Sequence, residues 1–378
     1  MSAPAPGAAT DPAVLMHSIL KRIATGPELS KDLSQEEACA GMRCVLEGRV
    51  DPVQAGVFLI ALRMKRETDD ENRGLLDAIR EATLRVTAPV DEVVDIGDPY
   101  DGCNRTLPAA PFLPAVLAAC GVAAVSHGVQ RMGPKYGVTH RQVLRAAGLP
   151  VELSPEAAAA RLGDPAVGWS YVDQEAFCPQ LHALAALRRL IVKRPAITTA
   201  EVLAGPLRGR VRTHLVTGYV HKPYPRIYAL LARHAGFDSA LIVRGVEGGV
   251  IPSLCQTGKV FRYRDRGEEW SEEFKPADLG IDQTLRAPQI PGGIPLEENA
   301  AAEAGTALDR ERLAEAAAAA GLAALEGRTG PTYDALVYGA ALCLWHLGRA
   351  DSLKDAAHAA RGAIDSGQAR AHLRGERP

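Results

Sequence analysis

Two loops rich in glycine and proline carry side chains that could bind phosphate. The first, residues 97–106, follows an apolar stretch typical of a buried strand and precedes a helix-forming segment at 111–120. The second, residues 129–138, lies between a strand-like stretch at 122–128 and a helix-forming segment at 139–147. A loop between a strand and a helix can present backbone N–H groups to an anion. Each loop could be an ordinary connection, but two in succession favour a site for a phosphate-bearing small molecule.

The candidate phosphate-binding residues lie on these loops and on the strand between them. They are Tyr100, Asp101, Gly102, Arg105, Thr106, His127, Gly128, Arg131 and Lys135. Arg131 and Lys135 share a loop with glycines that let backbone approach an anion, although both could instead be solvated charges. His127 could be a structural histidine, and Thr106 could simply cap a helix.

The elements that position the loops fall into two groups. Residues 13–88 have a helical pattern, and residues 1–12 are expected to be disordered. Capping boxes are predicted at Ser34, Asp51 and Thr68, because each has Glu or Gln three residues later. The helix expected at 52–65 is apolar nearly all round, so it is either buried in its own domain or used in a dimer contact.

From residue 93 onward, predicted strands alternate with predicted helices. Further strands are expected at 169–172, 212–217 and 240–243, and helices at 179–190, 225–235, 332–347 and 352–366. This alternation predicts a mostly parallel sheet covered by helices. An Asp-Arg-Gly turn between 259–264 and 269–274 predicts a hairpin appended to that sheet. The expected fold is therefore α/β, with a small all-helical N-terminal domain and a larger domain over 89–378.

Bulk composition excludes several classes of protein. The formal net charge is only −2, and none of the seven cysteines forms a Cys-x-x-Cys pair. A general polycation and a cysteine-based metal site are therefore excluded, and free thiols indicate a cytoplasmic protein. No apolar run reaches 18 residues, so no membrane span is expected.

One segment is locally basic. Residues 188–226 hold nine Lys or Arg side chains and a single acid, Glu201. If these side chains share a face, they would suit the backbone of single-stranded nucleic acid. Alternatively, they pair with the acid-rich stretch at 268–282.

An ordered set of motifs resembles the anthranilate phosphoribosyltransferase family, which has the glycosyl transferase family 3 fold. The helical motifs at 33–48 and 55–65 and the ending at 348–371 are similar to that family. In between, the matching motifs are His127-Gly128, Lys135 with Gly137, Phe177-x-Pro179-x-x-His182, Gly205-Pro206-Leu207 and Gly218-x-x-His221.

The resemblance implies a fold of the class II nucleoside phosphorylase type, with the active site between the two domains. It implies that a segment near 176–200 completes the helical domain, and that two chains form a homodimer through their helical domains. The implied reaction is attack by an acceptor nitrogen on phosphoribosyl pyrophosphate, with magnesium-bound pyrophosphate leaving. The candidate acceptor-side residues are His182, Arg188, His221, Lys222, Tyr224 and Arg244. Alternatively, His182 is structural, residues 221–224 form a bare turn, and Arg244 pairs with Glu247.

The chain departs from the family at its phosphate and metal motifs. The family's Gly-Thr-Gly-Gly-Asp loop is replaced at 97–101, and its Asn after His-Gly is Val129. Its adjacent Asp and Glu, which hold magnesium, are Val250 and Ile251, so that only Glu247 could supply a carboxylate. We therefore expect a divergent pentosyltransferase with a non-standard acceptor and weak or no anthranilate activity. The alternative is a non-catalytic protein that binds nucleic acid in the same basic groove.

Overall fold

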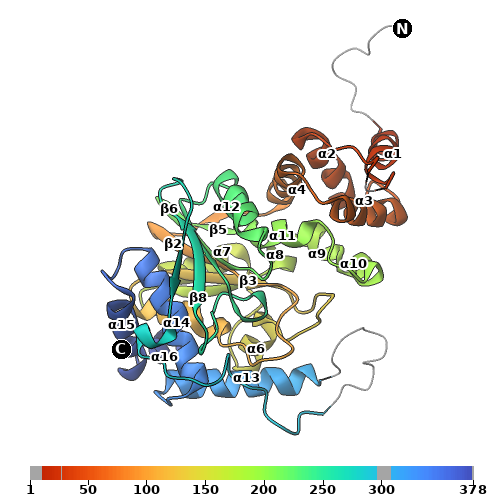
Figure 1. Ribbon diagram of the computed structural model, residues 1–378. Helices are drawn as coiled ribbons and strands as arrows, with labels where there is room; N and C mark the ends of the chain where they lie inside the picture. The colour runs from red at the N-terminus through yellow and green to blue at the C-terminus, as the bar shows by residue number, and fades with distance from the viewer. Residues whose placement is uncertain (1–10, 27, 296–307, 377–378) are drawn as a thin grey trace, which may run out of the picture.

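A helical bundle lies against one side of an α/β domain in the computed structural model, which describes residues 11–26, 28–295 and 308–376 (Figure 1). This arrangement confirms the expected fold class. Within the described residues, no helix combines the length and the apolar character needed to cross a membrane. The disorder expected for residues 1–12 falls almost wholly outside the described residues.

The first four helices form most of the bundle: α1 Pro12–Ile23, α2 Gln35–Leu46, α3 Pro52–Lys65 and α4 Asp69–Ala82. The capping boxes at Ser34 and Thr68 are confirmed. At Asp51 the prediction is wrong in detail, because the carboxylate accepts from the N–H of Val53, two residues on. Pro52 fills the first helical position, where the missing N–H costs nothing.

Four short helices follow in the middle of the chain, α8 Gln174–Phe177, α9 Pro179–Ala183, α10 Ala185–Ile191 and α11 Ile197–Ala200, and the last three pack against this bundle. α9 and α11 contact α4, and α10 contacts α3. The single helix expected at 179–190 is wrong, because the chain breaks at Leu184 between α9 and α10. The break lets α10 turn toward α3 instead of continuing along α4.

A seven-stranded sheet forms the centre of the α/β domain, in the order β4-β3-β2-β6-β7-β8-β9. The strands are β2 Glu92–Gly97, β3 Ala124–Gly128, β4 Trp169–Asp173, β6 Arg212–Gly218, β7 Ser239–Val243, β8 Gly258–Tyr263 and β9 Trp270–Phe274. β2, β3, β4, β6 and β7 are parallel, and the β8–β9 hairpin adds antiparallel strands, as expected. A separate two-stranded sheet, β1 Val86–Thr87 with β5 Leu207–Arg208, was not foreseen.

Alternating side chains of the strands feed two separate cores. Along β2, Val94 and Ile96 belong to one core and Val93 belongs to the other. The first core includes α5 Leu113–Ala119, α6 His140–Ala146 and the C-terminal helices α13 Arg310–Leu325, α14 Pro331–His346, α15 Leu353–Asp365 and α16 Gln368–Arg374. The second includes the bundle, α7 Pro155–Gly163 and α12 Tyr224–His234. The site must therefore lie at an end of the sheet, since both faces are covered.

A pair of buried histidines links the sheet to α14. The hydroxyl of Ser239 lies 2.8 Å from Nδ1 of His214 and 2.9 Å from Nε2 of His346. Burial lowers the pKa of His214, and burial with nearby arginines lowers the pKa of His346 well below its ordinary value. Both side chains are therefore held in the neutral form.

Candidate functional site

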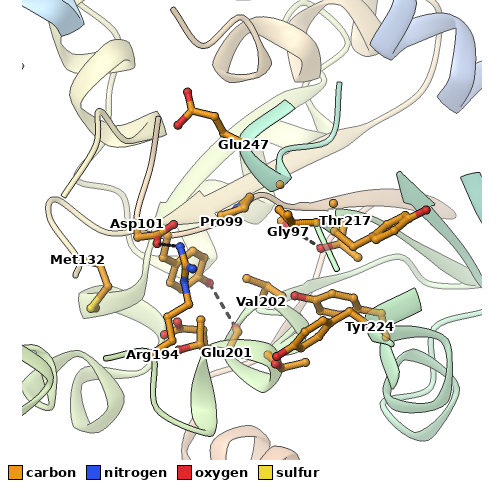
Figure 2. Close-up of a pocket in the computed structure, with 18 of the residues that line it drawn as sticks. Gly97, Pro99, Asp101, Met132, Arg194, Glu201, Val202, Thr217, Tyr224 and Glu247 are labelled. Carbon is orange, nitrogen blue, oxygen red and sulfur yellow. Dashed lines mark hydrogen bonds and ion pairs between the residues drawn. The ribbon is translucent and has the colours of Figure 1, made fainter. Parts of the chain in front are cut away.

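A pocket opens where the strand order reverses, at the carboxyl ends of β2 and β6. Gly97, Thr217 and Gly218 form its floor, and the bundle contributes Arg63 from α3. Tyr224 of α12 forms part of one wall (Figure 2). Tyr228 of the same helix also lines the pocket. The cavity measures about 170 Å³. Ligands of open α/β sheets bind at such a switch point, so this cavity is the candidate site.

Carboxylates already pair with the cations around this pocket. Arg188 makes a bidentate ion pair with Glu201, at 2.5 and 2.8 Å, and both side chains are almost fully buried. Arg194 pairs with Asp101, and the two side chains point toward each other in Figure 2. Nε of Arg63 lies 3.2 Å from Glu67. The pocket is therefore nearly neutral, and an anionic ligand has to compete with these carboxylates.

A chain of buried polar groups runs from Tyr100, which lines the pocket, into the sheet. Nε2 of His127 is 2.8 Å from Oδ1 of Asp95, and Nδ1 is 2.5 Å from the hydroxyl of Tyr100. Asp95 accepts from the Nε2–H, so Nδ1 is left to accept from Tyr100. Burial raises the pKa of Tyr100 well above its ordinary value. His127 is only 1% exposed and is occupied on both nitrogens, so the structure places it as support for the first loop rather than in the cavity.

The Glu247 carboxylate occupies the cradle of N–H groups in the first loop. It accepts from the N–H of Asn104 (3.2 Å), the N–H of Arg105 (3.0 Å) and the hydroxyl of Thr106 (2.9 Å). Its side chain points away from the pocket centre in Figure 2. Two adjacent backbone donors with a hydroxyl are the type of group that binds a phosphate oxygen. An internal anion thus fills the cradle that the sequence predicted for a ligand.

Lys135 connects the second loop to Glu247 and to the first loop. Its ammonium group donates to the Glu247 carbonyl at 3.2 Å and lies 3.5 Å from Asp101 and 3.8 Å from the Glu247 carboxylate. Gly102 has φ +68°, and a Cβ there would lie 2.4 Å from the carbonyl oxygen of Val138. Gly102 therefore allows the two loops to touch, as the bridge between Cys103 and Val138 shows.

The remaining candidate site residues do not all line the pocket. Of the acceptor-side set, Arg188, His221 and Tyr224 line the pocket, where the Tyr224 hydroxyl lies 2.7 Å from Arg63. Arg131 stacks on Tyr136, with 5.4 Å from the guanidinium carbon to the ring centroid, and does not line the pocket.

Three further candidates also lie outside the pocket lining. Gly128 is buried near the Tyr171 hydroxyl, and Lys222 is exposed. His182 faces Glu175 at 4.0 Å. These side chains are therefore not brought together with Arg188 and Tyr224 in this structure.

A second, larger groove of about 760 Å³ adjoins the pocket. The two cavities share Tyr219, Val220 and Glu247. Arg105 and Arg244, which the sequence assigned to the phosphate side and the acceptor side respectively, both line this groove. Arg286, which sequence reasoning missed, lines it as well.

The residues at the family's metal position do not fit magnesium. Val250 is 1% exposed and offers only its N–H, which donates to Asp98, and Ile251 has a hydrocarbon side chain. The Glu247 carboxylate is already bound by three donors. Among the residues that the structure describes, no cluster of three or more His, Cys, Asp or Glu could hold a metal ion. A hard cation prefers several oxygen ligands, and this position lacks them.

The basic segment 188–226 does not form one surface. Thr217 and Gly218, at the carboxyl end of β6, line the pocket, whereas Arg212 begins the same strand at its opposite end. Arg212 pairs there with Asp265, outside the acid-rich stretch that was considered as its partner. Arg226 pairs with Asp69 of the bundle. The continuous basic groove considered from sequence is therefore absent from these residues.

Sequence reasoning missed several residues that line the pocket. Arg63, Thr198, Thr199, Glu201 and Tyr228 all contribute to it, as does Arg194, which the sequence had placed only in the basic segment. Arg63 donates a hydrogen bond to Tyr224, which lies 161 residues later in the chain, so no local sequence pattern could reveal this contact. Glu201 did carry a signal, because it is the single acid in a basic segment.

Two sequence profiles of one family cover most of the chain. The profile described as "Glycosyl transferase family, helical bundle domain" matches residues 17–83, and "Glycosyl transferase family, a/b domain" matches residues 90–370. An anthranilate phosphoribosyltransferase from Rhodopseudomonas palustris is 29% identical over 94% of this chain and 96% of its own length. An uncharacterized protein from Aquifex aeolicus is 29% identical over 71% of this chain and 79% of its own.

Solved structures of the same kind share the fold. Anthranilate phosphoribosyltransferase from Thermus thermophilus superimposes with a TM-score of 0.70 at 23% identity, covering 94% of this chain and 97% of that one. The Saccharomyces cerevisiae enzyme in complex with PRPP and Mg gives 0.71 at 16% identity, covering 95% and 96%. At these identities the likeness establishes the architecture.

Proposed function

The chain belongs to the glycosyl transferase family whose helical-bundle and α/β domains it carries, and from this membership we propose that it is a phosphoribosyl (pentosyl) transferase-like protein with a non-standard acceptor and weak or no anthranilate activity. Its relatives include anthranilate phosphoribosyltransferases. The observation that carries the proposal is the sugar-sized cavity between the bundle and the carboxyl ends of β2 and β6, which adjoins the cradle of anion-binding donors through Glu247.

In this proposal the first loop holds the negative charge of the pentosyl donor. A diphosphate that leaves C1 of a pentose needs positive charge and N–H donors around it. The chain offers Arg194, Lys135 and the N–H groups of Asn104 and Arg105 for this task. Each of them now contacts Asp101 or Glu247, so a ligand has to displace a carboxylate before it binds. This competition supports weak handling of a highly charged donor.

The opposite wall is proposed to orient the acceptor. Arg188 and Glu201 hold each other rigidly, and the pocket also presents the Tyr224 hydroxyl and the exposed His221. These groups can hydrogen-bond a polar acceptor and place its nucleophilic atom toward the sugar, which is the main requirement of a transfer without a covalent intermediate. An unprotonated nitrogen attacks C1 with its own lone pair, and the proton that it sheds after the bond forms can pass to solvent.

A turnover assay combined with ligand-binding measurements tests the proposal. With anthranilate, phosphoribosyl pyrophosphate and magnesium, we expect turnover below that of an ordinary family enzyme by roughly a thousandfold or more, since loss of a metal costs several kcal/mol of barrier. Phosphoribosyl pyrophosphate alone should still raise the melting temperature, because it binds the folded state. Robust anthranilate turnover contradicts the proposed divergence, and no thermal shift contradicts the proposed ligand class.

The homodimer also stays a proposal. Phe58, Leu59 and Leu62 of α3 are buried within the bundle, but Val53 and Met64 are both 73% exposed. These exposed apolar side chains support a contact with a second copy through the helical domain. A cytoplasmic location remains a prediction of the free thiols and the composition.

A further inference from the structure

The 760 Å³ groove differs from the central pocket in its charge. In the central pocket, Arg63, Arg188 and Arg194 all pair with carboxylates. In the groove, Arg105, Arg244 and Arg286 make no salt bridge with any carboxylate of the described residues, and all three are exposed. The groove therefore carries uncompensated positive charge, in contrast to the central pocket.

The single acid of the groove does not neutralise these arginines. Glu247 shares the wall between the two cavities, and its carboxylate is bound to the N–H groups of Asn104 and Arg105 and to the Thr106 hydroxyl. These donors are neutral and leave the carboxylate its charge, but one negative charge faces three guanidinium groups, so the groove keeps a net positive charge. The guanidinium groups are left as the strongest unused donors of the groove.

The backbone fixes the positions from which the three arginines extend. The N–H of Arg244 donates to the carbonyl of Lys259 at 2.9 Å, where β7 meets β8. The carbonyl of Arg286 accepts from Leu254 at 2.9 Å, and the N–H of Arg105 donates to Glu247. Three anchored arginines around one groove lose less freedom on binding an anion than three on mobile loops. Ser253, Gln256 and Thr257 add neutral hydrogen-bonding groups to the lining.

We propose that this groove is a second anion-binding site, which binds the phosphate groups of a small polyanionic ligand. Guanidinium groups match phosphate oxygens in bidentate geometry, and three of them suit a ligand with several phosphates. A small ligand is favoured over nucleic acid because the three arginines surround one groove of about 760 Å³, whereas Arg210 and Arg212 lie at the opposite end of β6. The proposal concerns binding alone, so it stands whether or not a pentosyl group is transferred.

Titration calorimetry with inorganic tripolyphosphate, without metal, tests this site on the full-length protein. The test variant is Arg244→Gln/Arg286→Gln, which removes two charges from the groove. The matched control is Arg210→Gln/Arg212→Gln, which removes two charges from exposed arginines at the far end of β6. All four side chains are exposed, and thermal unfolding checks that each variant remains folded.

We expect the groove variant to bind tripolyphosphate about 10-fold or more weakly, since removing a charge-assisted hydrogen bond lowers affinity strongly. The control should stay within about threefold of the wild type, a change explained by net charge alone. Equal effects in the two variants, or no tripolyphosphate binding by the wild type, overturn the proposal. A short single-stranded oligonucleotide serves as a second probe. Binding of the oligonucleotide without binding of tripolyphosphate also overturns it.

Discussion

Removing the Glu247 carboxylate should make the protein bind pyrophosphate more tightly. The ordinary expectation for a polar residue at a binding site is the reverse. Here the carboxylate accepts from Asn104, Arg105 and Thr106, at 3.2, 3.0 and 2.9 Å, and Lys135 lies 3.8 Å away. A phosphate that enters the cradle must break these contacts and also meet a like charge. In Glu247→Ala the same donors stand free.

The size of the gain follows from these contacts. One hydrogen bond to a charged group contributes about 1.5–3 kcal/mol, so freeing the cradle should lower the Kd for pyrophosphate by roughly 10- to 150-fold. Glu247→Gln keeps an acceptor oxygen but no charge, and we expect it to fall between the wild type and Glu247→Ala. Without ligand, Glu247→Ala should melt at a lower temperature, because several partly buried donors lose their acceptor.

The assay is titration calorimetry with inorganic pyrophosphate on the wild type and the two variants. Glu152→Ala is the matched control, because Glu152 also accepts from two donors, Arg141 and Arg145, but lines neither cavity. The control should leave pyrophosphate affinity unchanged. If folded Glu247→Ala binds pyrophosphate no more tightly than the wild type, the cradle is not an anion site and the reasoning fails.

Three further predictions rest on other contacts. The pKa values of His346 and His214 are lowered in the folded protein, so below about pH 6.5 the unfolded chain binds more protons than the folded one. The free energy of unfolding should therefore be greatest above about pH 6.5 and fall below it by up to about 1.4 kcal/mol per histidine per pH unit. Urea unfolding at pH 7 and 5.5 should show a smaller loss for His346→Gln than for the wild type. Arg188→Met should lower the free energy of unfolding in urea by about 3–5 kcal/mol, because it leaves the buried Glu201 carboxylate without its partner. The double variant Arg188→Met/Glu201→Leu should recover much of this free energy, and no recovery would refute the reasoning. Light scattering should find twice the mass of one chain, with Val53→Glu shifting the protein toward the monomer; a wild type that is monomeric at micromolar concentration contradicts the dimer.

Periodicity was enough to predict the sheet and most of its helices. Alternating strands and helices give the parallel part of the sheet, and the Asp-Arg-Gly turn gives the hairpin, in which Asp265 and Arg266 adopt positive φ. These features arise from neighbours in the sequence. The broken helix at Leu184 was missed because both halves have helical composition, and the break depends on where α10 meets α3.

The site was harder to predict, because its contacts join distant parts of the chain. Sequence motifs located the two loops but not the carboxylate that fills the first of them, since Glu247 lies 143 positions from Asn104. His127 was a candidate ligand because it ends a strand, and only the positions of Asp95 and Tyr100 show that both its nitrogens are occupied. Arg105 and Arg244 were recognised as candidates, but their common groove depends on the fold.

The way the C-terminal helices cover the sheet constrains how the chain can be synthesised. α5, near residue 119, packs against α14, α15 and α16, and the Trp169 indole donates to the carbonyl of His372 at 2.9 Å. A ribosome that adds about 5–20 residues per second needs roughly 10–50 s to make the chain between α5 and α16. During that interval this face of the growing sheet has α5 and α6 but lacks the cover that α13 to α16 provide. The bundle likewise lacks α9, α10 and α11 when its first four helices have emerged. Neither domain can therefore complete its packing until segments much later in the chain have been made.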